Sequence, residues 1–282
     1  MNSARARRPC GTCKIRSVSV SLSSVRVGSP SASKVVVMLH GIYGRGRNWL
    51  TIAKGLAAAR PEVACLLLDL PHHGESGPGS GVETVRGIAA DVAGWLDDQH
   101  IAPDVLLGHS FGGKVALAMA DQWRDRDLQV WVVDSTPGTR EQSGGAWDLL
   151  RTVSGLPARF ASRDELVTLL TARGWNAGLA RWMATNLARE GDGFVWRLDF
   201  DVMTRLLEDF VATDLWSVVE QPASGHTIHF IKATESNMLS PDAVKRVQAA
   251  HPATVQLHHL EGSHWIHTER PDEVVALLAR EL

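Results

Sequence analysis

The 282-residue chain has few cysteines, little net charge and no long hydrophobic run. Its 3 cysteines cannot build a disulfide framework, which excludes a small disulfide-stabilised secreted fold. A net charge of −2 argues against a general nucleic-acid-binding protein, which needs a basic excess to neutralise phosphates. The longest apolar runs, residues 35–39 and 63–68, are far shorter than the ~20 residues that span a bilayer. We therefore expect a globular protein without a membrane span.

Acidic residues are missing from the start of the chain, where none precedes Glu62. The first 14 residues also lack the apolar segment of a secretory signal. We expect residues 1–14 to form a disordered basic tail and the protein to be cytoplasmic; a mitochondrial or plastid transit peptide is the alternative. Cys10 and Cys13 have the spacing of a metal or redox pair, but no second pair follows them, so we expect no metal site there.

Apolar runs that alternate with helical patterns predict the fold. The alternation of apolar and polar residues over 18–27 predicts a half-exposed antiparallel hairpin. Continuous apolar runs, which a parallel sheet buried on both faces requires, follow at 35–39, 63–68, 105–107, 130–133 and 228–231, with shorter alternation at 255–257. Helical patterns lie at 48–59, 82–98, 111–122, 241–250 and 271–282. This order predicts an α/β fold with a doubly wound, mostly parallel sheet.

The stretch between Val133 and Ile228 is too long for a single crossover. We expect a helical cap over residues 137–219, inserted into an α/β core formed by residues 15–136 and 220–282. Ser162 and Glu165 form a capping box that predicts a helix through Ala172. Further helices are expected over 177–189 and 201–210. The insert holds five of the 10 tryptophans, which we expect mainly to fill its core: Trp147, Trp175, Trp182, Trp196 and Trp216.

The sharpest chemical signal is Gly108-His-Ser110-Phe-Gly112, which directly follows an apolar strand and opens a helix. A chain that turns from strand to helix within a few residues crowds its backbone, and the two glycines remove side chains that would clash. The motif therefore predicts a nucleophile elbow, in which the Ser110 hydroxyl stands above the sheet edge beside a helix N-terminus.

A serine nucleophile needs a base, and His264 is the best candidate because it follows the last strand. Loops beyond the carboxyl ends of parallel strands meet at one edge, which brings His264 near Ser110. His264 and His267 are three residues apart, but no zinc motif accompanies them, and we expect no metal. The acid that orients His264 is expected to be Asp134, which ends the strand after the elbow helix; Glu235, one strand further along, is the alternative.

Acyl transfer also needs hydrogen-bond donors where negative charge develops on the carbonyl oxygen. We expect the backbone N–H groups of Phe111 and Ile42 to form this oxyanion hole, the latter within the loop His40-Gly-Ile-Tyr-Gly44. The segment Asp69-Leu-Pro-His-His-Gly-Glu-Ser76 contains residue types that could be mistaken for catalytic groups. Its proline and glycine instead predict a hydrogen-bonded turn.

Together these motifs resemble those of an α/β-hydrolase, as does Gly262-Ser-His-Trp-Ile-His267 before Arg270-Pro271. Within that superfamily the chain is most similar to small bacterial acyl-esterases and to mitochondrial abhydrolase-domain relatives, over residues 35–282. The resemblance implies hydrolysis of carboxylic esters or thioesters. In that subgroup the acid follows the strand after the elbow helix, which favours Asp134, whereas Glu235 departs from the subgroup's pattern.

We therefore expect a serine hydrolase without a cofactor that cleaves esters, or thioesters, of small to medium acyl groups through an acyl-enzyme. The alternatives are other serine chemistry on the same fold, such as C–C bond hydrolysis or perhydrolysis, and a non-enzymatic ligand-binding role. The expected partner is a small acyl ester, not a nucleic acid, and the chain is expected to be a monomer or homodimer. The tryptophans of the cap predict an apolar acyl pocket, to which we assign His40, Tyr43, His109, Trp196 and Trp265.

Overall fold

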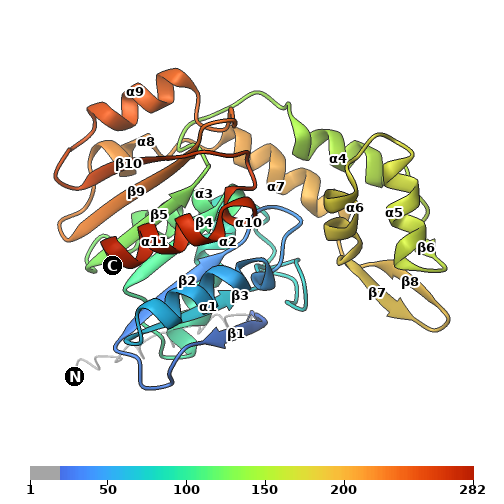
Figure 1. Ribbon diagram of the computed structural model, residues 1–282, viewed down its shortest axis with the longest axis horizontal. Helices are drawn as coiled ribbons and strands as arrows, with labels where there is room; N and C mark the ends of the chain where they lie inside the picture. Colours follow the sequence, from blue (N-terminus) through green and yellow to red (C-terminus); the bar gives the residue numbers. More distant parts are fainter. Residues whose placement is uncertain (1–19) are drawn as a thin grey trace, which may run out of the picture.

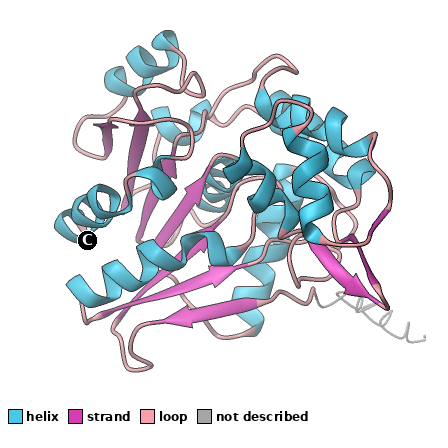
Figure 2. Ribbon diagram, turned by 45° about the vertical axis from the view of Figure 1, so that its right-hand side comes forward, coloured by secondary structure: helices cyan, strands magenta, loops and turns pink. Residues whose placement is uncertain are grey.

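The computed structural model describes residues 20–282. A seven-stranded sheet with the order β1-β3-β2-β4-β5-β9-β10 forms its centre, and helices cover both faces (Figure 2). Neighbouring strands are parallel except β1, which is antiparallel to β3. The strands are β1 (Ser24–Val27), β2 (Lys34–Leu39), β3 (Val63–Leu68), β4 (Val105–His109), β5 (Leu128–Val133), β9 (His226–Ala233) and β10 (Val255–Leu260). The predicted doubly wound, mostly parallel sheet is confirmed.

Both faces of the sheet are apolar because each face is covered by helices. On β2, Val36 and Met38 pack against α1 and α11, whereas Val37 and Leu39 belong to the core beneath α2 and α3. Successive residues of a strand point to opposite faces, so burial of both faces makes the run continuously apolar. The covering helices are α1 (Leu50–Ala59), α2 (Val85–Asp98), α3 (Phe111–Gln122), α9 (Pro241–Ala249) and α11 (Pro271–Glu281), with the short helices η1 (Gly46–Trp49) and α10 (Ile266–Glu269).

The hairpin predicted over residues 18–27 is wrong in the described part of that range. Strand β1 pairs with β3, in the register of Ser24 with Leu68, and the Asp69 N–H donates to the Ser23 carbonyl at 2.9 Å. Alternation reports that one face of a strand is buried, but it does not identify the strand's partner. The expected tail over residues 1–14, with Cys10 and Cys13, lies outside the described residues.

Between β5 and β9 the chain leaves the sheet and forms an insert, most of which lies beside the core at the right of Figure 1. Long helix α7 connects this part of the insert back to the core (Figure 1). The elements of the insert are α4 (Gly145–Ser154), β6 (Arg159–Phe160), α5 (Arg163–Thr171), α6 (Ala177–Ala184), β7 (Leu187–Glu190), β8 (Gly193–Trp196), α7 (Phe200–Ala212) and α8 (Trp216–Glu220). Among residues 20–282, no helix combines the length and the apolar character needed to cross a bilayer.

Two helices of the insert begin as predicted, and a third is shorter than predicted. The Ser162 hydroxyl accepts the Glu165 N–H at 3.1 Å, which caps α5, and α7 covers the expected stretch 201–210. The helix expected through Arg189 ends at Ala184, because residues 187–196 form the hairpin of β7 and β8 around Gly191 at φ +60°. Together with β6, these two strands make a three-stranded sheet of order β6-β8-β7, which the sequence pattern did not predict.

Candidate active site

Ser110 stands at the sharp turn between β4 and α3. Its backbone angles, φ +52° and ψ −115°, are unfavourable for a residue with a side chain. A Cβ on Gly108 would lie 2.1 Å from the Gly112 carbonyl oxygen, and a Cβ on Gly112 would lie 2.4 Å from the Leu39 oxygen. Only glycine fits at either position, so these residues allow the strained turn that the motif predicts.

The His264 imidazole is paired with a buried carboxylate. Its Nδ1 lies 2.7 Å from Oδ2 of Asp134, which follows β5 at φ +43° and is 1% exposed. The other oxygen of Asp134 accepts the Ala233 N–H at 3.2 Å. A carboxylate at Nδ1 holds the proton on that nitrogen and leaves Nε2 free to accept one. Glu235 is exposed, and its carboxylate makes no hydrogen bond within residues 20–282, so the structure brings Asp134 and not Glu235 to His264.

The loop that carries His264 is held from two sides. His109, the residue before Ser110, lies with Nε2 2.8 Å from the His264 carbonyl oxygen and with its ring centroid 4.6 Å from the His264 ring. On the other side, the Ser263 N–H and hydroxyl both donate to the Glu269 carboxylate, at 2.8 and 2.6 Å. His109 is 2% exposed, so in this structure its side chain orients the His264 loop instead of facing an open pocket.

The loop after β2 lies against the elbow. An added Cβ on Gly41 would be 3.4 Å from the Ser110 Cβ, so the backbone there passes close to the serine. His40 is 1% exposed and fixes this loop, because its Nδ1 contacts the Gly41 oxygen at 2.8 Å and its Nε2 accepts the Leu70 N–H at 2.9 Å. Phe111 begins α3, where a backbone N–H has no acceptor within the helix. The two candidate oxyanion donors therefore lie in segments next to Ser110: Phe111 directly follows it, and Ile42 follows Gly41.

The other residues assigned to the pocket have different surroundings. Trp265 is half-buried, with its ring 5.9 Å from that of His264 and 4.8 Å from that of Trp182 in α6. Tyr43 is 1% exposed, and its hydroxyl donates to the Ala146 carbonyl at the start of α4. Trp196 packs on aromatic rings of the insert and donates to a carbonyl there, so its contacts do not reach Ser110 or His264.

The segment that begins at Asp69 is a hydrogen-bonded turn, as predicted. One carboxylate oxygen of Asp69 accepts the Gly46 N–H at 2.7 Å and the other accepts the Glu75 N–H at 2.8 Å. The Ser76 hydroxyl donates to the Asp69 carbonyl at 2.6 Å. Glu75 in turn forms an ion pair with Arg197 of the insert at 2.8 Å. Its polar residues therefore hold the loop together and bind the insert.

Lys114, in the elbow helix, is a buried residue whose role the sequence did not predict. Its Nζ donates to the carbonyl oxygens of Gly138, Phe210 and Thr213, at 2.8, 2.6 and 3.0 Å, and it is 0% exposed. Gly138 lies where the insert begins, and the other two carbonyls lie at the end of α7, so Lys114 joins both ends of the insert to the elbow helix. Burial lowers the pKa of Lys114 to about 7, and the nearby Asp214 and Asp209 carboxylates offset part of this shift. A lone lysine within the apolar residues 111–120 of this helix was the signal in the sequence.

Lys114→Met is expected to lower the free energy of unfolding by about 3 kcal/mol. Methionine keeps the length of the side chain, but it leaves three buried carbonyl oxygens without their donor, at about 1–3 kcal/mol each, partly offset by relief of the buried charge. Denaturant titration measures the change, and Lys54→Met, at an exposed position of α1, is the matched control. Equal stability of the two variants would contradict this role.

Four buried histidines lie at or after the carboxyl ends of parallel strands. Burial lowers the pKa of His40 to about 4 and those of His73 and His267 to about 3, and it holds the pKa of His109 well below its usual value. These imidazoles are therefore neutral at pH 7. Within residues 20–282, no group of three or more His, Cys, Asp or Glu side chains is arranged to hold a metal ion.

The known proteins that this chain resembles include a lipase and esterases. The chain is 28% identical over 257 residues to the sn-1-specific diacylglycerol lipase ABHD11 of Mus musculus, covering 86% of this chain and 80% of that protein. It is 24% identical over 250 residues to the esterase YbfF of Escherichia coli, covering 88% and 92%. A solved marine microorganism esterase has the same fold, with a TM-score of 0.82 at 20% identity over 94% of this chain and 100% of that one.

These matches confirm the resemblance to bacterial esterases and abhydrolase-domain proteins. The model of the alpha/beta hydrolase family matches residues 36–277. This range includes all the parallel strands except the first two residues of β2, and it ends about one turn before the end of α11. The strained serine between β4 and α3 and the histidine after β10 stand in the order that this fold requires. The chain belongs to the alpha/beta hydrolase family.

Proposed function

We propose that the chain is a serine-dependent carboxylic ester hydrolase in which Ser110 is the nucleophile, His264 the base and Asp134 the acid. The observation that carries this proposal is the 2.7 Å contact between His264 Nδ1 and Asp134 Oδ2, at the sheet edge where Ser110 occupies a strained turn. The names of the relatives, a lipase and esterases, support ester hydrolysis.

The proposed mechanism follows from these positions. His264 Nε2 accepts the hydroxyl proton as Ser110 Oγ attacks the acyl carbon, and the Asp134 carboxylate stabilises the imidazolium that forms. The N–H groups of Ile42 and Phe111 hold the oxyanion. The alcohol leaves with the proton from His264, and a water molecule then releases the acid by the same steps. Ser110 and His264 are not hydrogen-bonded here, as is common before substrate brings a base and nucleophile together.

We also propose that residues 137–219 act as a cap that completes the acyl pocket. Support comes from two contacts with the loop after β2: Tyr43 Oη donates to the Ala146 carbonyl at 3.1 Å, and Asn186 Nδ2 donates to the Tyr43 carbonyl at 2.9 Å. Trp182 of the insert packs on Trp265 beside His264. Aromatic side chains at this place favour small to medium acyl groups, in esters or thioesters.

Labelling with a fluorophosphonate tests the proposal without a choice of substrate. Intact-mass analysis is expected to find one adduct on the wild type and none on Ser110→Ala, and labelling of His264→Ala is expected to be strongly slowed because the hydroxyl loses its base. Ser217→Ala, which replaces an exposed serine of α8, is the matched control and is expected to label like the wild type. A folded wild type that takes no label would contradict the proposal and favour a ligand-binding role.

A further inference from the structure

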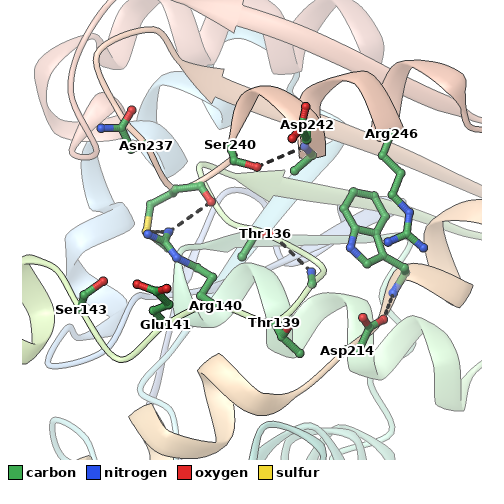
Figure 3. Close-up of a pocket in the computed structure, with 14 residues that line it drawn as sticks. Thr136, Thr139, Arg140, Glu141, Ser143, Asp214, Asn237, Ser240, Asp242 and Arg246 are labelled. Carbon is green, nitrogen blue, oxygen red and sulfur yellow. Dashed lines mark hydrogen bonds between the residues drawn. The ribbon is translucent and has the colours of Figure 1, made fainter.

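A polar pocket of about 460 Å³ lies between the segments that follow β5 and β9. One wall is formed by the segment that leaves β5, residues 136–143, and the others by the start of α8 and by residues 237–246, which follow β9 (Figure 3). Strands β5 and β9 are parallel neighbours. The pocket therefore lies beyond their C-terminal ends, at the sheet edge that also carries Ser110 and His264.

Arg140 is a half-buried cation in the wall of this pocket. Its backbone N–H donates to the Val211 carbonyl at 2.8 Å, and its guanidinium donates to the Met238 carbonyl at 3.2 Å. The guanidinium also contacts the Met238 sulfur. In the part of the chain that the structure describes, Arg140 forms no ion pair with a carboxylate, so most of its five N–H donors have no protein acceptor.

Arg246 and Asp214 of the pocket differ from Arg140 because protein groups contact their charged side chains. Arg246 forms an ion pair with Glu220, with one N–O contact at 3.0 Å, and lies over the Trp216 ring at 4.1 Å. Asp214 accepts the Trp216 N–H at 2.9 Å. An arginine keeps its charge in a protein, so partial burial without an anion leaves the Arg140 guanidinium less solvated than it is in water. A negatively charged group of a ligand would restore the lost interaction.

Arg140 is also electrostatically linked to the proposed triad. Burial lowers the pKa of Arg140, and the nearby Asp134 carboxylate raises it. Thr136 and Gly138 both line the pocket. Thr136 is two residues from Asp134, and the Gly138 carbonyl accepts a hydrogen bond from Lys114 of the elbow helix. An acyl chain attached at Ser110 could therefore extend along this edge of the sheet toward the pocket.

We propose that Arg140 binds a carboxylate at the far end of the substrate's acyl part, so that the enzyme prefers esters of dicarboxylic acids. This inference rests on the proposed function. We place the charge on the acyl part because that part stays bound through both steps. A carboxylate fits better than a phosphate dianion, because Glu141, Asp214 and Asp242 line the same pocket against two cations, Arg140 and Arg246, and would repel the larger charge more strongly.

The test compares p-nitrophenyl esters of linear dicarboxylic acids of about six to ten carbons with the same esters methylated at the far carboxyl. The readout is the ratio of kcat/KM for the carboxylate form to that for the methylated form. In the wild type we expect this ratio to be about tenfold to hundredfold at the best length, as for one charge-assisted hydrogen-bonded pair. Arg140→Gln is expected to bring the ratio close to one, mainly through KM. Arg246→Gln, the matched control in the same pocket, is expected to keep it.

Each result decides the inference. A wild type that cleaves both forms equally at every length would overturn it and leave ester hydrolysis intact. A wild type that cleaves neither form and takes no fluorophosphonate would overturn the proposed function itself. If both arginine variants lost the preference equally, the preference would arise from the electrostatic potential of the whole pocket. That result would overturn the specific role of Arg140. A faster reaction with a terminal phosphonate of matched length would overturn the choice of carboxylate.

Discussion

Asp134→Asn is expected to lower kcat for an ester substrate about 10⁴-fold, as loss of the acid does in other serine triads. Asparagine keeps the size of the side chain, but it removes the charge that stabilises the His264 imidazolium. It can also present an N–H to Nδ1, which favours the wrong tautomer. Steady-state kinetics with a p-nitrophenyl ester measure the loss, and a fall in kcat with little change in KM is expected because the contact acts in the transition state.

The control distinguishes the two carboxylates that the sequence left open. Glu235 is exposed and makes no side-chain hydrogen bond within the described residues, so Glu235→Gln is expected to change kcat by less than about twofold. A large loss in Glu235→Gln together with a mild one in Asp134→Asn would reverse the assignment of the acid.

Acidification is expected to destabilise the fold by several kcal/mol. The folded pKa values of His40, His73 and His267, about 4, 3 and 3, lie below the unfolded value of about 6.5. Between these values the unfolded chain binds more protons than the folded one, so the free energy of unfolding falls as the pH decreases from about 6.5 to about 4. Each fully buried imidazole contributes on the order of 2 kcal/mol to this fall.

Denaturant titrations at several pH values between about 7 and about 4 measure the effect. His251 is exposed, and His251→Gln is the matched control, expected to show the same pH dependence as the wild type. His267→Gln is expected to make the dependence weaker, because one buried group that must stay neutral has been removed. A free energy of unfolding that does not change over this range would show that these rings are not held neutral by the fold.

The parallel strands and most of their helices were predictable because burial on both faces leaves a direct pattern in the sequence. The run at β3 is apolar at every position, and α3 covers the stretch expected after the elbow. The partner of β1 was not predictable, since alternation carries no information about which strand lies alongside. The helix expected through Arg189 failed for a related reason: the hairpin of β7 and β8 is stabilised by pairing between strands, which overrides local helical preference.

The candidate site was predictable where a residue type is demanded by local geometry. Gly108 and Gly112 are required by close backbone contacts, and Ser110 lies between them. Buried polar side chains were harder to interpret, because a histidine in a motif suggests chemistry whether or not it touches a substrate. His40 and His109 were expected to line a pocket, yet each is almost fully buried and contacts backbone carbonyls of neighbouring loops.

The sequence by itself determined the class of fold and the strand–turn–helix around Ser110, because both depend on local pattern and on backbone crowding. Only the tertiary structure decided which carboxylate reaches His264. Asp134 and Glu235 both follow strands that end at the same edge, but the backbone at φ +43° brings the Asp134 side chain to the imidazole, and Glu235 remains in solvent. It likewise decided the role of Lys114, because its three carbonyl acceptors come from distant parts of the chain that only packing brings together.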